Sequence, residues 1–235
     1  MYQEIIDYAI QEANDLRQED RGSDAGEWHP SSLSGCARAA VYDYLGTEES
    51  DPTSIRSIRI MQRGTEMHEY VQGLVPSLEA EVDVDYAGIN GSCDGLLPVG
   101  EDENGIIWEV QEYKSIGSTG VKFMHPKPFG KRGPGNLPQP KPEHVKQARI
   151  YHGALRAMGK NLSNIIRIVY FNRDDWEVLE FEVPAWTDDE WHEFLAEIAD
   201  LEEHAESGTL PPRLPERDKF PCSYCNYRTT CWENE

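Results

Sequence analysis

Two carboxylates and a lysine lie in two neighbouring stretches of this 235-residue chain. Asp94 follows Gly91-Ser92-Cys93 in the first stretch, and Glu112 and Lys114 stand two residues apart in the second, so on a strand both point to one face. Carboxylates placed in this way bind hard divalent cations such as Mg²⁺ or Mn²⁺, which polarise a phosphoryl oxygen and lower the pKa of water. A lysine beside them orients that water or neutralises developing charge. The triplet alone is short, and a solvated strand face with one ion pair explains it better.

The cysteines near the C-terminus form a second reactive set. Cys222, Cys225 and Cys231 follow a C-x2-C-x5-C pattern. In a reducing compartment, three thiols so close in sequence are more often metal ligands than idle side chains. A tetrahedral site needs a fourth ligand, and Cys36 and Cys93 are the two candidates. Only one C-x2-C pair is present, so the irregular spacing favours an iron–sulfur cluster, with a structural zinc ion as the alternative.

Three further polar side chains fall on expected helices. His68 follows Gly64 by four residues, and Gln147 and Tyr151 stand at i and i+4, on one helical face. Gln147 offers amide hydrogen bonds, and Tyr151 offers a ring for base stacking and a hydroxyl. Each of these is also typical of an ordinary, partly buried helix.

The charge is strongly acidic but unevenly distributed. Lys and Arg number 22 against 43 Asp and Glu, a net charge of −21, which argues against a protein coated in nucleic acid. Residues 174–206 carry acids and no Lys or Arg. The bases gather instead on one side of a helix at Arg56, Arg59 and Arg63, and in a segment that holds Lys122, Lys127, Lys131, Arg132, Lys141, Lys146 and Arg149. We expect this basic segment to attract polyanions, although a solvated helix face explains the three arginines equally well.

Hydrophobic periodicity indicates the elements that position these residues. Helices are expected over residues 2–18, behind a cap at 31–34, over 53–78 and 143–158, and after a capping box at Thr187 and Glu190. Strands are expected over residues 81–86, 89–97, 106–114, 165–171 and 176–183, the second of them broken by Gly91 and Gly95. The proline-rich residues 117–142 are expected to form one long loop, which is usually functional or disordered. This order predicts an α/β fold with a central mixed sheet flanked by helices.

Composition narrows the class of protein. The apolar content of 38% is ordinary for a folded chain, and no apolar run reaches the length of a membrane span. The N-terminus has neither the basic nor the apolar region of a signal peptide. We therefore expect a cytoplasmic protein that contacts no membrane. It has no G-x-x-x-x-G-K-[ST] motif, so any DNA unwinding would come from a partner.

Taken together, these motifs resemble the RecB-like branch of the PD-(D/E)XK nuclease superfamily. The similarity is greatest to its iron–sulfur exonucleases, including the CRISPR-associated exonuclease group and phage relatives. It extends from Ser32 to Trp232 and rests on the order of six motifs: Ser34-Gly35-Cys36-Ala37-Arg38, Gly64 with His68, Gly91-Ser92-Cys93-Asp94-Gly95, Glu112-Tyr113-Lys114, Gln147-x3-Tyr151 and the terminal cysteine triplet.

The resemblance implies roles for individual residues. His68, Asp94, Glu112 and the backbone carbonyl of Tyr113 correspond to the metal ligands, and Lys114 corresponds to the catalytic lysine. Gln147 and Tyr151 correspond to the motif that places DNA at the site. The four ligands of a [4Fe–4S] cluster correspond to Cys36, Cys222, Cys225 and Cys231, which leaves Cys93 as a spare thiol.

The resemblance further implies a restriction-endonuclease-like core in a single nuclease domain, 1–235. The Cys36 region and residues 210–235 would together form the cluster subregion. The expected activity is metal-dependent exonuclease cleavage of single-stranded DNA in recombination, repair or phage DNA processing. A helicase or a recombination protein is a candidate partner. The alternative is a catalytically inactive or zinc-stabilised module that binds DNA or recruits a partner.

Overall fold

The computed structural model describes residues 1–21, 25–131 and 133–233. The chain divides into two compact units, one made of residues 1–65 and 193–235 and the other of residues 66–192. Among the described residues, no helix is both long enough and apolar enough to cross a membrane.

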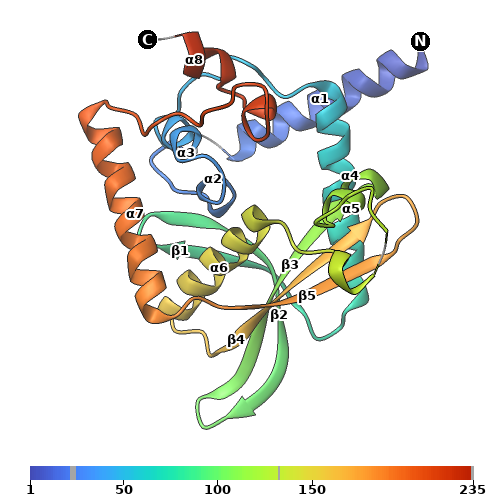
Figure 1. The fold of residues 1–235 in the computed structure, drawn as a ribbon, viewed down its shortest axis with the longest axis vertical. Coiled ribbons are helices and arrows are strands. Elements are labelled where there is room, and N and C mark those ends of the chain that lie inside the picture. Colours follow the sequence, from blue (N-terminus) through green and yellow to red (C-terminus); the bar gives the residue numbers. More distant parts are fainter. Residues whose placement is uncertain (22–24, 132, 234–235) are drawn as a thin grey trace. The chain divides into compact units, whose positions relative to one another are not determined.

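The second unit is built on a five-stranded mixed sheet, as the sequence predicts (Figure 1). The strand order is β1-β2-β3-β4-β5; β3 and β4 are parallel, and the other neighbouring pairs are antiparallel. The bounds are β1 Glu79–Tyr86, β2 Ile89–Asp102, β3 Gly105–Ile116, β4 Leu162–Asn172 and β5 Val178–Pro184. A parallel pair needs a crossover, and helix α6 (Pro142–Ala157) supplies it between β3 and β4.

Helices cover both faces of this sheet. Apolar residues of α6, among them Ile150, Ala154 and Leu155, are fully buried, and the helix contacts β1, β2, β3 and β4. The C-terminal end of α4 (Ile55–Leu74) packs Met67 and Val71 against Tyr113, Val169 and Phe171. Since successive strand residues point to opposite faces, Tyr113 turns toward α4, and its neighbours Glu112 and Lys114 turn toward α6. Central strand β3 is therefore covered on both sides.

The first unit is helical, and its C-terminal segment packs against N-terminal residues. It contains α1 (Tyr2–Arg21), α2 (Pro30–Leu33), α3 (Ala37–Tyr44), a 3₁₀ turn η2 (Cys222–Tyr224) and α8 (Arg228–Glu233). The Tyr227 hydroxyl donates to Asp43 Oδ1 at 2.7 Å, and Thr229 N–H donates to Asp51 Oδ2 at 2.7 Å. Nearby, the rings of Trp28 and Tyr44 stack with centroids 4.2 Å apart.

Several expected boundaries were wrong. The expected loop at 117–142 contains α5 (Ser118–Phe123) and a 3₁₀ turn η1 (Pro134–Asn136). The helix expected to carry Cys36 is split into α2 and α3, with Cys36 as the extended N-cap residue of α3. Strand β2 runs well beyond residue 97, with a register shift between Pro98 and Gly100.

The break expected at the glycines of β2 was also wrong. The strand is continuous through Gly91 and Gly95, and both residues pair with a neighbouring strand. A Cβ at Gly95 would lie 2.7 Å from Leu78 Cδ1. This glycine therefore marks a close approach within the strand rather than its end.

The capping box, by contrast, is confirmed at the start of α7 (Asp188–Ser207). Thr187 N–H donates to Glu190 Oε2 at 2.8 Å, and Glu190 N–H donates to Thr187 Oγ1 at 3.2 Å. The two residues satisfy each other's backbone donors, which begins the helix at the position that the sequence predicts.

Candidate active site

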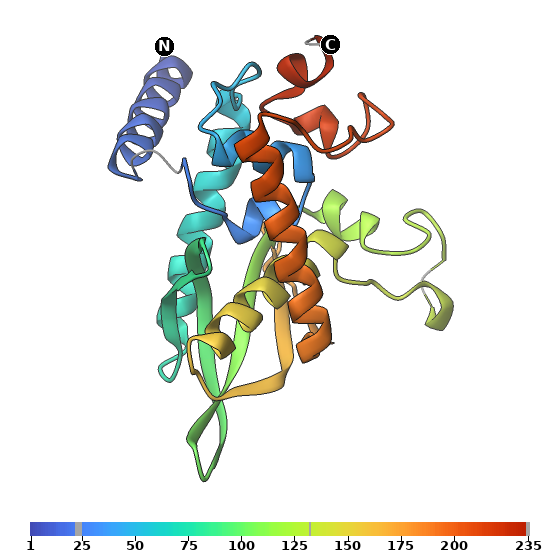
Figure 2. The same cartoon turned by 90° about the vertical axis from the view of Figure 1, so that its left-hand side faces the viewer.

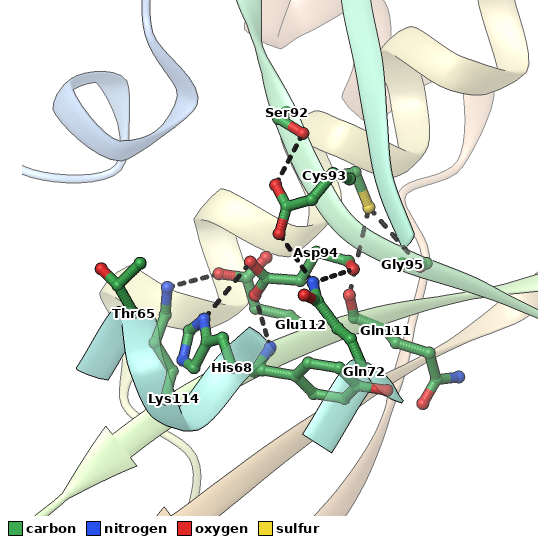
Figure 3. Close-up of polar contacts among 12 residues, drawn as sticks. Thr65, His68, Gln72, Ser92, Cys93, Asp94, Gly95, Gln111, Glu112 and Lys114 are labelled. Atoms are coloured by element: carbon green, nitrogen blue, oxygen red, sulfur yellow. Dashed lines mark hydrogen bonds and ion pairs between the residues drawn. The ribbon is translucent and has the colours of Figure 1, made fainter. Parts of the chain in front are cut away.

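Strand β3 brings Glu112 and Lys114 together. Their side chains share a face, and Lys114 Nζ lies 2.5 Å from Glu112 Oε1 (Figure 3). The side chain of Glu112 is only 1% exposed and that of Lys114 is 21% exposed. Burying a carboxylate beside a lysine costs free energy, because both groups lose hydration. Such a pair therefore indicates a functional use of the charges.

Asp94 on β2 joins this pair. Its Oδ2 accepts a hydrogen bond from Tyr113 N–H at 2.6 Å, which fixes the carboxylate against β3. Its Oδ1 lies 3.6 Å from Nδ1 of His68, which α4 supplies. The three strand residues and His68, far apart in sequence, thus belong to one cluster, as Figure 3 shows.

Helix α6 adds Gln147 to the cluster. Lys114 Nζ donates to Gln147 Oε1 at 3.1 Å. Tyr151, one turn further along the helix, is 6% exposed, and burial raises the pKa of its hydroxyl. The i, i+4 pair expected from the sequence therefore faces β3, and Gln147 contacts the lysine directly.

The pKa values of Glu112 and Lys114 are both raised. Burial, with a contribution from Asp94, raises the pKa of Glu112 to about 7, although Lys114 opposes the shift. Burial works against the charge of Lys114, but the carboxylates of Glu112 and Asp94 outweigh it and raise the pKa of Lys114. A second cation near Glu112 would favour its ionised form.

The donor set fits a hard divalent cation. Glu112 Oε1 pairs with Lys114, whereas its buried Oε2 has no hydrogen-bond partner among the described residues. A buried carboxylate oxygen without a partner is rare in proteins, and a bound cation would satisfy it. In the part of the chain that the structure describes, no three His, Cys, Asp or Glu side chains stand close enough to hold a metal. The fit therefore rests on the chemistry of the donors, which are oxygens of the kind Mg²⁺ and Mn²⁺ prefer.

Sequence reasoning missed a polar network beside Asp94. Gln72 Nε2 donates to Glu81 Oε1 at 2.6 Å and to the Asp94 carbonyl at 2.9 Å. Ser92 Oγ donates to Glu81 Oε2 at 3.0 Å. Gln72 lies one helical turn after His68, so it was detectable as a neighbour on the same face of α4.

The four cysteines expected to act as ligands line one cavity in the first unit. Its volume is about 310 Å³, and Cys36, Cys222, Cys225 and Cys231 all border it. Burial, together with the other thiols of the set, raises the pKa of Cys222 and of Cys225. Four sulfur donors around one cavity suit a metal cluster, although the described side chains do not stand close enough to hold a single ion. Cys93 is not among them, because it is fully buried in β2 with Sγ 3.6 Å from the Gly95 carbonyl.

The expected DNA-binding bases are distributed along the chain rather than gathered in one element. Arg56, Arg59 and Arg63 lie on α4, and Arg59 pairs with Asp7 at 3.4 Å. Lys122 and Lys131 are exposed in the segment between β3 and α6, and Arg132 lies outside the described residues.

Comparisons with known proteins identify the family and the fold. The sequence profile described as the PD-(D/E)XK nuclease superfamily matches residues 3–232. The mixed sheet with its flanking helices agrees with the restriction-endonuclease-like core expected from the sequence. A solved structure titled "Crystal structure of SSO0001" superposes with a TM-score of 0.56, at 18% identity, over 99% of this chain and 96% of that chain. At this identity the likeness is one of fold alone. No curated protein matches the chain.

Proposed function

Because the chain belongs to the PD-(D/E)XK nuclease superfamily, we propose that it is a divalent-metal-dependent deoxyribonuclease of the RecB-like, iron–sulfur branch. We propose further that it acts as an exonuclease on single-stranded DNA. The observation that carries the proposal is the buried Glu112 carboxylate, with one oxygen paired to Lys114 and the other without a partner among the described residues. Such a carboxylate beside Asp94 suits a cation and a phosphodiester better than a purely structural role.

The proposed roles follow from the donor atoms. His68, Asp94, Glu112 and the Tyr113 carbonyl would hold Mg²⁺ or Mn²⁺. When bound, such a cation supplies Lewis-acid activation of the phosphoryl oxygen and acidifies the attacking water. The Tyr113 N–H fixes one oxygen of Asp94, which supports this role.

Lys114 would position the nucleophile. An ammonium group carries three donors. Nζ donates to Gln147 Oε1 at 3.1 Å and forms an ion pair with Glu112 Oε1 at 2.5 Å, and a further donor would serve a water or a phosphate oxygen. A donor held in place before the reaction stabilises the charge that develops on the phosphate.

End-labelled oligonucleotides test this function. The experiment compares single-stranded and duplex substrates, blocked at either end, with Mg²⁺, with Mn²⁺ and with EDTA. We expect metal-dependent degradation of single strands from a free end, and Glu112→Gln should lower the rate by at least about 100-fold. Glu103→Gln, an exposed acid in the β2–β3 turn, is the matched control and should cleave normally. Full activity of Glu112→Gln or in EDTA would overturn the proposal.

We also propose that Cys36, Cys222, Cys225 and Cys231 hold a [4Fe–4S] cluster with a structural role. Their common cavity supports this assignment, as do the thiol donors, since Cys thiolates are the usual ligands of such clusters. Anaerobic purification with iron and sulfide analysis is the test. Cys225→Ser should lose iron and visible absorbance, whereas Cys93→Ala should keep both. Zinc in place of iron would refute the cluster and favour a zinc-stabilised module.

A further inference from the structure

Residues 117–131 and 133–141, here called the β3–α6 arm, are not explained by the metal site. The arm leaves β3 after Ile116, two residues beyond Lys114, and ends where α6 begins, five residues before Gln147. Figure 2 shows this yellow-green segment standing out from the sheet. Both ends of the arm therefore lie close along the chain to residues of the proposed active site.

Buried polar groups hold the arm in a defined shape. Asn136 is 5% exposed, and its side chain accepts from Lys127 N–H at 2.7 Å and donates to the Lys127 carbonyl at 3.0 Å. His125, 4% exposed, places Nδ1 2.6 Å from the Asn136 carbonyl. Gln139 N–H donates to the Met124 carbonyl at 2.8 Å, which closes the base of the arm. A segment with its own buried hydrogen bonds has a defined backbone path.

Two exposed side chains of the arm are aromatic. Phe129 is 84% exposed and Phe123 is 58% exposed, so most of their ring surface is open. The two rings meet edge to face, with centroids 5.9 Å apart and planes at 82°. Apolar rings that are exposed side by side are costly in water and mark a candidate binding surface.

The surroundings of the two rings are basic. Lys122, Lys127 and Lys131 are exposed on the same arm. Residues 114–142 contain no Asp or Glu, in a chain whose net charge is −21. A second exposed aromatic pair in the same unit, Tyr70 and Trp176, has acidic sequence neighbours instead, at Asp174, Asp175 and Glu177. Of these two pairs, the first alone combines open rings with positive charge.

We propose that the β3–α6 arm binds single-stranded DNA, with bases stacked on Phe129 and Phe123 and phosphates on its lysines. Lysines along a backbone path with rings for successive bases are the usual means of binding single strands without sequence preference. A duplex covers the faces of its own bases, so the rings select unpaired strands. The inference rests on the proposed nuclease function for the choice of DNA, and it assigns the arm as the site that delivers the strand.

Binding in EDTA separates the arm from catalysis. We expect Phe129→Ala to weaken binding of a fluorescent oligothymidylate by roughly tenfold, measured by anisotropy, with duplex binding unchanged. Lys127→Ala should weaken binding at low salt and reduce the slope of log affinity against log salt by about 0.7. Trp176→Ala, the matched control from the acidic pair, should bind as the wild type does. Because Phe129 is so exposed, its variant should unfold at the wild-type temperature.

A small substrate keeps the two proposals distinguishable. Bis(p-nitrophenyl) phosphate with Mn²⁺ is too small to span the arm and the site, so Phe129→Ala should hydrolyse it at the wild-type rate. Loss of that hydrolysis in Glu112→Gln would support the nuclease proposal and would leave the arm proposal unaffected. The arm proposal fails if Phe129→Ala binds oligothymidylate normally, if Trp176→Ala weakens binding as much, or if the arm binds oligouridylate but not oligothymidylate.

Discussion

The side chain of Lys114 has little rotational freedom, because its ammonium group has two protein partners. Its ammonium group pairs with Glu112 from the same strand and donates to Gln147 from α6, and its side chain is 21% exposed. Lysine loses considerable rotamer entropy when it is fixed in this way. We infer that the glutamine positions the lysine.

This role of Gln147 predicts a kinetic signature. Gln147→Leu removes the neutral acceptor while keeping a similar volume, so Lys114 loses one of its two partners. Hydrogen bonds to charged groups contribute about 1.5–3 kcal/mol, so we expect a fall in kcat of about tenfold or more, with a smaller change in KM. Single-turnover cleavage measures the effect, and circular dichroism should show that the variant is folded. An increase in KM alone would instead indicate that Gln147 only binds DNA.

Helix α6 packs closely against a tryptophan ring at one of its glycines. A Cβ at Gly153 would lie 2.2 Å from Trp191 Cε3, so only glycine lets this ring approach the helix. Trp191 is 5% exposed. On α4, by contrast, a Cβ at Gly73 would meet no atom within 4 Å. Packing therefore requires glycine at position 153, whereas at position 73 there is room for a larger side chain.

A pair of glycine substitutions tests this difference. Gly73→Ala should stabilise the protein by about 0.5–1 kcal/mol, because alanine loses less backbone entropy in a helix. Gly153→Ala should destabilise it by about 1–3 kcal/mol, because the ring must shift in a packed interior. Urea denaturation gives both values. Stabilisation by both substitutions would show that Trp191 does not pack on Gly153.

The start of α6 predicts a pH dependence of stability. His144 Nδ1 lies 2.9 Å from the Tyr170 hydroxyl, which also accepts from Lys141 N–H at 2.9 Å. A neutral imidazole with Nδ1 unprotonated accepts a hydrogen bond from that hydroxyl. Burial, with the positive charges of Lys114 and Lys141, lowers the pKa of His144 to about 3. In the unfolded chain this pKa is about 6.5.

The sign of the effect follows from these two pKa values. Between about pH 6.5 and pH 3 the unfolded chain binds more protons than the folded one, so stability decreases as the pH falls. We expect His144 to contribute a loss of about 1–2 kcal/mol between pH 7.5 and pH 5. His144→Gln, which keeps an acceptor for Tyr170, should lack that part of the loss in urea titrations at the two pH values. Equal losses in variant and wild type would contradict the assignment.

At the scale of the whole molecule, the proposed cofactors belong to different units. The cysteines line a cavity in the unit of residues 1–65 and 193–235, and the metal-site residues lie in the unit of residues 66–192. The single nuclease domain expected from the sequence stays a prediction, as does its cluster subregion. Cys36 and Cys231 are far apart in sequence, so a cluster that joins them would close a long loop and restrict the unfolded chain.

This division predicts a regional response to loss of the cluster. Oxidative removal of iron should expose amides of α2, α3 and α8 to hydrogen exchange, because metal binding and folding are coupled there. Amides of β2, β3 and β4, which form the centre of the sheet, should keep their protection. Mass spectrometry of peptides before and after treatment measures both. Uniform loss of protection, or none, would contradict a cluster whose structural effect is confined to one unit.

The sequence by itself determined the elements and the residue types of the site. Alternation at 81–86 and 106–114, the capping box at Thr187 and the spacing of Glu112 and Lys114 are local patterns, so they were readable without tertiary information. The order of helices and strands was enough to indicate a mixed α/β sheet. Boundaries near glycine and proline were read less well, since Gly95 continues a strand and residues 118–123 form a helix.

Only the tertiary structure decided how these residues meet. The contact of Gln147 with Lys114, the fixing of Asp94 by Tyr113 and the network of Gln72 with Glu81 all join segments paired by sheet register or helix packing. The burial of Glu112 likewise depends on both faces of β3 being covered. Its raised pKa and unpartnered oxygen arise from that burial, which no local pattern specifies, because exclusion of water is a property of the packed chain.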